Sequence, residues 1–271
     1  MRSMLLCTIA LAGGCWSAMS AQQGEGKAQE AVSYAPKPTR LIPYTPPQKP
    51  HTRLQDVKAK HKGQAEWSEW VIKDDYLWTQ YIQSAPGSKV SPRFHPDNRE
   101  WWVILEGEIR FQIEGQEPFV ARRRSMVQVP TQTIYSMETV GEKPAIRYEV
   151  NIPNVSTLFT EPPRTHAPGI EFIPIRLGRH PFPYVDNNKP HINLDDLAAG
   201  NPNYSGGRFV NDDRAGCTII YGYNSKLPPV NDKDRGHFHP DNAESWVILQ
   251  GLMRYKIEGQ EVFVASEGDV V

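Results

Sequence analysis

Apolar and polar residues alternate along several stretches of the chain, with the two-residue period of a half-buried β-strand. From Ile109 to Ile113 the apolar positions alternate with Arg110 and Gln112, and positions 253, 255 and 257 repeat the arrangement around Arg254. Because successive side chains of a strand point to opposite faces, this pattern predicts antiparallel strands with one face in a core. We expect strands at 69–73, 76–83, 101–105, 109–113, 119–121, 133–138, 146–150 and 217–223.

Helical patterns are few and short. Leu54, Val57 and His61 have helical spacing, which predicts a helix over 52–62 that ends at Gly63. A second helix is predicted over 194–199, where Asn193 is a suitable N-cap and two aspartates follow in the first turn. Many short strands and few helices predict an all-β chain of barrel or jelly-roll type.

The chain contains an internal repeat. Residues 94–121 (FHPDNREWWVILEGEIRFQIEGQEPFVA) and 238–265 (FHPDNAESWVILQGLMRYKIEGQEVFVA) align without a gap, offset by 144 positions (238 − 94). The first copy continues through predicted strands to Val150, whereas Val271 corresponds only to Val127. We therefore expect the second copy to be incomplete, as in a fragment, and to leave an open sheet edge.

A candidate metal site is formed by three residues, His237, His239 and Glu244, at the start of the second copy's apolar run. His237 and His239 project to the same side of an extended chain, and Glu244 follows after the turn formers Pro240 and Asp241. Two imidazole nitrogens and one carboxylate suit a divalent transition metal, with bonds of roughly 2.0–2.2 Å. The alternative is two exposed loop histidines beside a solvated carboxylate.

The spacing Gly236-His237-x-His239-x4-Glu244-x6-Gly251 resembles the first signature of the cupin superfamily. The segment from Glu267 to Val271 resembles the start of the second cupin signature. The resemblance implies two tandem cupin domains, which are jelly-roll β-barrels, with the C-terminal one incomplete. It also implies an iron, manganese or zinc ion bound by His237, His239 and Glu244, with a fourth ligand beyond residue 271.

The first copy departs from this pattern. Arg93 stands at the position of His237, while His95 and Glu100 keep their equivalents, and Tyr135 stands where the resemblance places the last histidine. A guanidinium has no lone pair to offer a metal. We expect this degenerate first site to be metal-free, with Arg93 paired to Glu100. A surviving anion-binding pocket there is an open alternative.

The first 21 residues have the features of an export signal. Arg2 precedes an apolar run from Met4 to Ala12, and small residues near Ala21 fit a cleavage site. The run is too short to span a bilayer. We therefore expect a secreted or periplasmic protein. Lipid anchoring at Cys15 is the less favoured alternative, and without the signal Cys217 has no intramolecular disulfide partner.

Composition limits the remaining function classes. The net charge of −1, without a basic stripe, argues against nucleic acid as a partner, and 39% apolar residues support a real core. The predicted organisation is a signal peptide at 1–21, a proline-rich arm at 22–62, a first cupin domain at 63–152, a connector at 153–205 and a second cupin domain at 206–271. Three connector histidines beside prolines, His166, His180 and His191, are interpreted as surface residues.

The resemblance implies a metal-dependent oxidoreductase, dioxygenase-like, that acts on a small organic molecule in a pocket lined by Trp246, Met253 and Tyr255. A metal-dependent isomerase and a non-catalytic sugar-binding or storage-type cupin are the alternatives, because this fold hosts all three. No separate catalytic acid, base or nucleophile can be assigned from the sequence, and a homo-oligomer is left open.

Overall fold

The computed structural model describes residues 4–11, 34–163, 166–184, 188–212, 214–222, 236–240 and 242–271. The chain divides into two compact units. Unit 1 comprises Met1–Lys60 and Asn201–Val271, and unit 2 comprises His61–Gly200. The connector therefore belongs largely to unit 2, and the proline-rich arm to unit 1.

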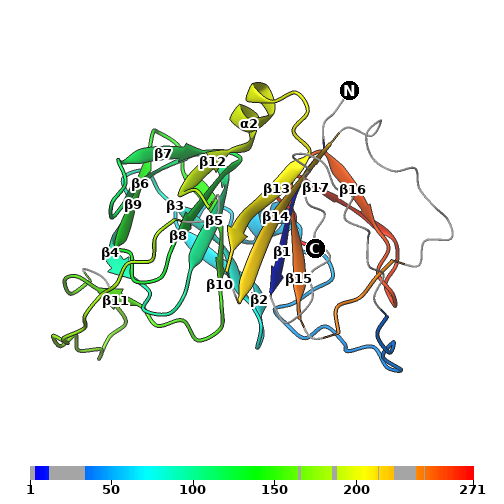
Figure 1. Ribbon diagram of the computed structural model, residues 1–271, viewed down its shortest axis with the longest axis horizontal. Helices are drawn as coiled ribbons and strands as arrows, with labels where there is room; N and C mark the ends of the chain where they lie inside the picture. Colours follow the sequence, from blue (N-terminus) through cyan, green and yellow to red (C-terminus); the bar gives the residue numbers. More distant parts are fainter. Residues whose placement is uncertain are drawn as a thin grey trace, which may run out of the picture. The chain divides into compact units, whose positions relative to one another are not determined.

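Unit 2 is built from two antiparallel sheets (Figure 1). Its elements are β2 (Trp67–Lys73), β3 (Trp78–Ser84), β4 (Lys89–Phe94), β5 (Glu100–Glu106), β6 (Glu108–Ile113), β7 (Phe119–Arg122), β8 (Ser125–Val129), β9 (Tyr135–Val140), β10 (Ala145–Asn151), β11 (Leu158–Phe159), β12 (His191–Asn193) and α2 (Leu194–Gly200). One sheet has the order β12-β8-β5-β10-β3-β2 and the other β11-β4-β9-β6-β7.

The core of unit 2 lies between these sheets. Buried apolar side chains from both of them, among them Trp102, Ile104, Phe111, Ile113 and Met137, form one cluster. The alternation in β6 gives the expected burial, with Ile109, Phe111 and Ile113 inside. The predictions of an all-β fold and of the strands in this region are confirmed.

Four strands of unit 2, β4, β8, β11 and β12, are absent from the prediction, and for β4 and β8 the reason is identifiable. β4 contains Pro92, a residue that usually argues against a strand interior. β8 is buried at every position, so it shows no alternation from which a strand could be inferred. The helix α2 follows its prediction closely, because Asn193 Oδ1 accepts hydrogen bonds from the backbone N of Asp195 (3.1 Å) and Asp196 (3.3 Å).

The prediction that all three connector histidines are surface residues is wrong for His191. His191 lies in β12, where its ring stacks on Phe119 with centroids 4.6 Å apart and its Nε2 is 3.0 Å from Ser125 Oγ. Burial lowers the pKa of His191 below its usual value. His166 and His180 are exposed, as expected.

Unit 1 contains β1 (Met4–Leu11), α1 (Leu54–Lys60), β13 (Gly206–Asn211), β14 (Ala215–Gly222), β15 (Glu244–Gln250), β16 (Leu252–Tyr255) and β17 (Phe263–Ser266). Its main sheet has the order β13-β14-β1-β15, and β16 pairs with β17. A small core of Ile248 and Ala265 is covered by half-buried residues that include Trp246 and Tyr255. Cys217 is buried.

The main sheet of unit 1 has the same order as part of the larger sheet of unit 2. β15 repeats the sequence of β5, and the series β13-β14-β1-β15 corresponds to β2-β3-β10-β5. β1 pairs antiparallel with β14 and β15, as β10 does with β3 and β5. The segment predicted to be an export signal thus takes the place that β10 takes in unit 2.

Residues 269–271 of unit 1 lie beside β15 in the way that β8 lies beside β5 in unit 2. The backbone N of Trp246 and that of Val271 each donate to the other residue's carbonyl oxygen, at 2.8 and 2.9 Å, and Thr52 pairs with Val270. Asp269 Oδ1 accepts from the backbone N of Leu54 (3.1 Å), where α1 begins. Among the described residues β16 has β17 as its one strand neighbour, whereas β6 lies between β7 and β9.

No helix within the described ranges is long and apolar enough to cross a membrane.

Candidate metal centre

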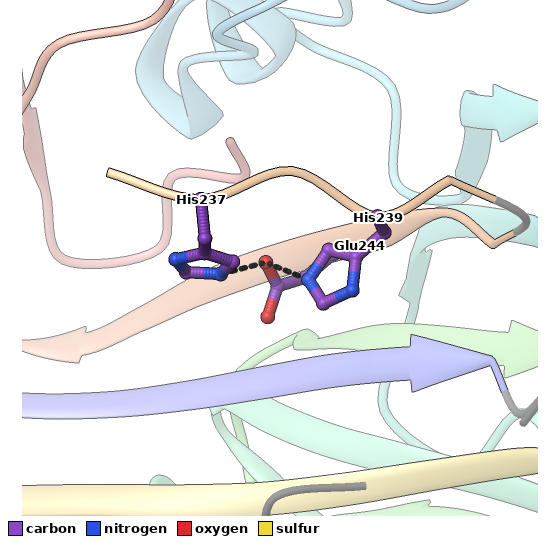
Figure 2. Close-up of side chains that lie close together, drawn as sticks. All are labelled: His237, His239 and Glu244. Atoms are coloured by element: carbon purple, nitrogen blue, oxygen red, sulfur yellow. Dashed lines mark hydrogen bonds and ion pairs between the residues drawn. The ribbon is translucent and has the colours of Figure 1, made fainter. Parts of the chain in front are cut away.

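The structure brings His237, His239 and Glu244 together at the start of β15 (Figure 2). The two histidines lie in an irregular segment before the strand, and Glu244 is its first residue. Glu244 Oε2 is 3.3 Å from His239 Nε2 and 3.9 Å from His237 Nε2. The three side chains converge although residues 236–239 do not form the extended strand from which their convergence was predicted.

The donor set fits a divalent transition metal. The ligand atoms all lie within 4.8 Å of one another. Neighbouring donors around a shared ion lie roughly 3 Å apart for bonds of about 2.1 Å, so side-chain rotations of modest size are sufficient. The His237 side chain is 70% exposed, His239 34% and Glu244 20%, which leaves the group open to solvent and to a small molecule.

Two of the three predicted pocket residues lie close to the carboxylate. Trp246 is two residues beyond Glu244 on the same face of β15, and its ring centroid is 6.3 Å from that of Tyr255. The Tyr255 hydroxyl is buried and has no hydrogen-bond partner among the described residues. Burial, and then the charge of Glu244, raise the pKa of Tyr255 above its usual range. Met253 packs against the core cluster of Ile248 and Ala265.

The equivalent place in unit 2 holds a hydrogen-bonded network. His95 Nε2 is 2.8 Å from Glu100 Oε2, and His95 Nδ1 is 2.9 Å from the carbonyl oxygen of Ser156. The Tyr135 hydroxyl donates to the same Glu100 oxygen and accepts from Arg93 Nε at 2.8 Å. Tyr135 therefore separates Arg93 from Glu100, so the direct pair predicted between those two residues does not form.

Burial and charge oppose each other in this network. Burial alone would raise the pKa of Glu100, but His95, Arg93 and the Tyr135 hydroxyl outweigh it and lower the pKa to about 2. Burial alone would lower the pKa of His95, yet Glu100 raises it above 6.5. At a pH between the pKa of Glu100 and that of His95, the pair is therefore an imidazolium and a carboxylate.

The first-copy network opens into a cavity of about 150 Å³, at the place where the sequence left a pocket as an alternative, but most of its wall residues were not predicted. Its other walls come from β2, β3, β10 and the loop before β11, none of which carries the repeated motif. The register pairs Gln80 with Glu149 and Trp78 with Asn151, so these polar side chains share the core-facing side with Trp102. A polar residue at a core-facing position of β10 was the available signal. The lining residues are Trp70, Trp78, Gln80, Arg93, His95, Glu100, Glu149, Asn151, Val155 and Thr157.

Comparison with known proteins supports the family resemblance for part of the chain. Residues 80–151, from β3 to the end of β10, match the family model described as a cupin domain. This match supports the cupin superfamily for that segment. A comparison with curated protein sequences gives no match.

Solved structures with related folds include three at low identity. An uncharacterised conserved protein with a double-stranded β-helix domain from Klebsiella pneumoniae is 14% identical with a TM-score of 0.33, over 36% of this chain and 81% of that one. The DMSP lyase DddQ from Ruegeria pomeroyi is 19% identical with a TM-score of 0.32, over 35% and 52%. The oxalate decarboxylase from Lactobacillus farciminis, in a formate complex, is 16% identical with a TM-score of 0.32, over 37% and 32%. Similarities of this size carry no information on substrate or reaction.

Proposed function

We propose that the chain is a bicupin in which the second copy, at 206–271, binds one divalent transition metal through His237, His239 and Glu244. The observation that carries this proposal is the convergence of the three donors on one another. The repeat and the matching strand orders of the two main sheets support a tandem pair of cupin domains. The first copy, at 63–152, is the metal-free member of the pair.

A metal-dependent oxidoreductase of dioxygenase type is the activity that we propose for this site, with a small organic molecule as substrate. A bound divalent metal would supply Lewis-acid chemistry that polarises a substrate oxygen. The chain's own residues orient the substrate: exposed His237 leaves an approach from solvent, and Trp246 offers an apolar surface. The unpartnered hydroxyl of Tyr255 can donate a hydrogen bond to an oxygen held there.

Metal analysis of the full chain, purified without chelators, tests the proposal. We expect about one metal ion per chain in the wild type and a loss of at least about tenfold in His237→Ala, because two donors then remain. Arg93→Ala and His180→Ala, which remove an arginine of the first copy and an exposed connector histidine, are the matched controls and should retain the metal. Equal retention in His237→Ala and Arg93→Ala would show that the metal lies elsewhere.

Turnover separates the catalytic proposal from its alternatives. Oxygen consumption by the metal-loaded wild type, absent in His237→Ala, is the expected result for a dioxygenase. Product formation without oxygen uptake would favour isomerisation. Metal binding without turnover of any offered small acid, sugar or phenol would favour a binding role.

We also propose that the protein is exported, with cleavage near Ala21. The charged start and apolar run of the first 21 residues support this proposal. Cleavage would remove β1 from the mature protein and leave β14 and β15 without the strand between them. Mass spectrometry of the protein recovered from the periplasm or medium should give a mature N-terminus near Gln22. An intact Met1 in that fraction would contradict export with cleavage.

A further inference from the structure

The cavity of unit 2 contains a cation, Arg93, that forms no direct ion pair among the described residues, although Glu100 and Glu149 line the same cavity. Arg93 donates from Nε to the neutral hydroxyl of Tyr135, and within the described part of the chain its two terminal nitrogens have no hydrogen-bond partner. A buried or partly buried charge is costly unless it is paired. Arg93 lines the cavity, and its guanidinium carbon lies 5.5 Å from the centroid of the Tyr135 ring, so the two terminal nitrogens are the donors that remain for a ligand.

The carboxylates around the cavity are already engaged by other donors. Glu100 accepts from His95 and Tyr135 at one oxygen and from Asn151 at the other. Glu149 accepts from Gln80 Nε2 (2.8 Å) and from Trp102 Nε1 (2.9 Å). Neither carboxylate forms an ion pair with Arg93 among the described residues, so an anion from outside would complete the pairing.

Aromatic side chains line one part of the cavity, with a lysine beside them. Trp70 and Trp78 form an aromatic side, and the exposed Lys73 places its Nζ 4.7 Å and 5.1 Å from their ring centroids. This lysine adds positive charge at the aromatic wall. A cavity of about 150 Å³ has room for roughly five water molecules, which is the space of a molecule with five or six heavy atoms.

From these observations we propose that the first copy is a metal-independent binding site for a short carboxylate, held by the terminal nitrogens of Arg93. A guanidinium matches a carboxylate through two parallel N–H···O hydrogen bonds, which a lysine cannot reproduce. Arg93 occupies the repeat position of His237, so a fixed side-chain cation replaces a metal ligand at this place. The two copies would then take different ligands.

Binding of L-lactate to the full chain, kept in EDTA, tests the proposal by isothermal titration calorimetry. The wild type should bind L-lactate at least tenfold more tightly than the neutral isostere lactamide. Arg93→Met should lose at least tenfold in lactate affinity, whereas Arg110→Met, which removes an exposed arginine of β6, should bind like the wild type. Equal affinity in the two arginine variants would overturn the proposal.

If Arg93→Met fails to fold, locating the bound lactate in the wild-type protein still tests the proposal. In protein labelled with 5-fluorotryptophan, the signals of Trp70 and Trp78, assigned by Trp→Phe substitutions, should shift on addition of lactate. A shift confined to Trp246, or no shift at saturation, would place lactate outside this cavity. His237→Ala should bind lactate normally. Affinity lost in His237→Ala and kept in Arg93→Met would overturn this inference and leave the metal-site proposal intact.

Discussion

Positions 93 and 237 show how one residue can change the chemistry of a repeated site. In both copies the sequence His-Pro-Asp-Asn begins two residues after this position, yet position 93 is arginine and position 237 is histidine. In unit 2 the arginine is joined by Tyr135, whose hydroxyl connects Arg93 to Glu100. His95 and Glu100 then bond to each other directly, so the lone pairs that a metal would need are used within the protein.

The His95–Glu100 pair predicts a pH-dependent contribution to stability. The pKa of Glu100 falls from 4.5 to about 2 on folding, so the stabilisation from this group is present above pH 4.5 and is lost as pH falls towards 2. The pKa of His95 is raised, so its contribution is complete below 6.5 and is lost as pH rises through the folded value. The pair is therefore most stabilising between pH 4.5 and 6.5.

His95→Gln measures this contribution. Urea unfolding should show a loss of about 3–5 kcal/mol at pH 5.5, because one partner of a buried pair is removed. The difference from the wild type should shrink at pH 3 and again at pH 9. A difference that stays constant from pH 3 to pH 9 would show that the pair does not titrate as described.

At the scale of the elements, the turns of the repeat control the sheet. Gly107 connects β5 to β6 with a φ of +71°, and an added Cβ would lie 2.7 Å from both Ala145 Cα and the Pro144 carbonyl oxygen. Its equivalent, Gly251, connects β15 to β16 with a φ of +85°. The glycine thus permits both the left-handed turn and the close approach of the start of β10.

Gly107→Ala should lower the free energy of unfolding by at least about 3 kcal/mol, because strain in the turn adds to a contact with backbone that cannot move aside. Gly115→Ala is the matched control. Gly115 has a φ of +77° with nothing within 4 Å of an added Cβ, so we expect a loss of only about 1–2 kcal/mol there. Similar losses in both variants, measured by urea unfolding, would show that the close approach is unimportant.

At the scale of the whole molecule, the duplication extends beyond the aligned segments. α1 precedes the strands of unit 2 in the sequence but belongs to unit 1, where the residues before it pair with Val270. α2 precedes β13 to β17 of unit 1 but belongs to unit 2, where it follows β12, the partner of β8. In each copy β8 or its equivalent therefore pairs with the segment that precedes the repeat of the other copy.

Local patterns were sufficient to predict much of this architecture. Alternation identified β6, and Asn193 marked the start of α2. β8 was not predicted because a fully buried strand has no alternating pattern. The placement of β1 beside β14 depends on long-range pairing, which local sequence does not indicate.

Of the two candidate sites, one could be predicted from local sequence and the other could not. The donors His237, His239 and Glu244 are close in sequence, so their spacing alone was informative. The wall residues of the first-copy cavity, such as Trp70 and Glu149, come from strands that are distant in sequence. Only the register of those strands brings these residues to one cavity, so the surroundings of Arg93 could not be inferred from local sequence.

Imidazole ligation in the second copy is the central proposal for this protein, and electron spin echo spectroscopy of the Mn²⁺-loaded full chain measures it directly. With ¹⁵N-labelled histidine, the wild type should show coupling of the ion to two imidazole nitrogens, and His237→Ala should show coupling to one at most. Bound Mn²⁺ without histidine coupling, or the same coupling in His237→Ala as in the wild type, would contradict the proposed metal centre.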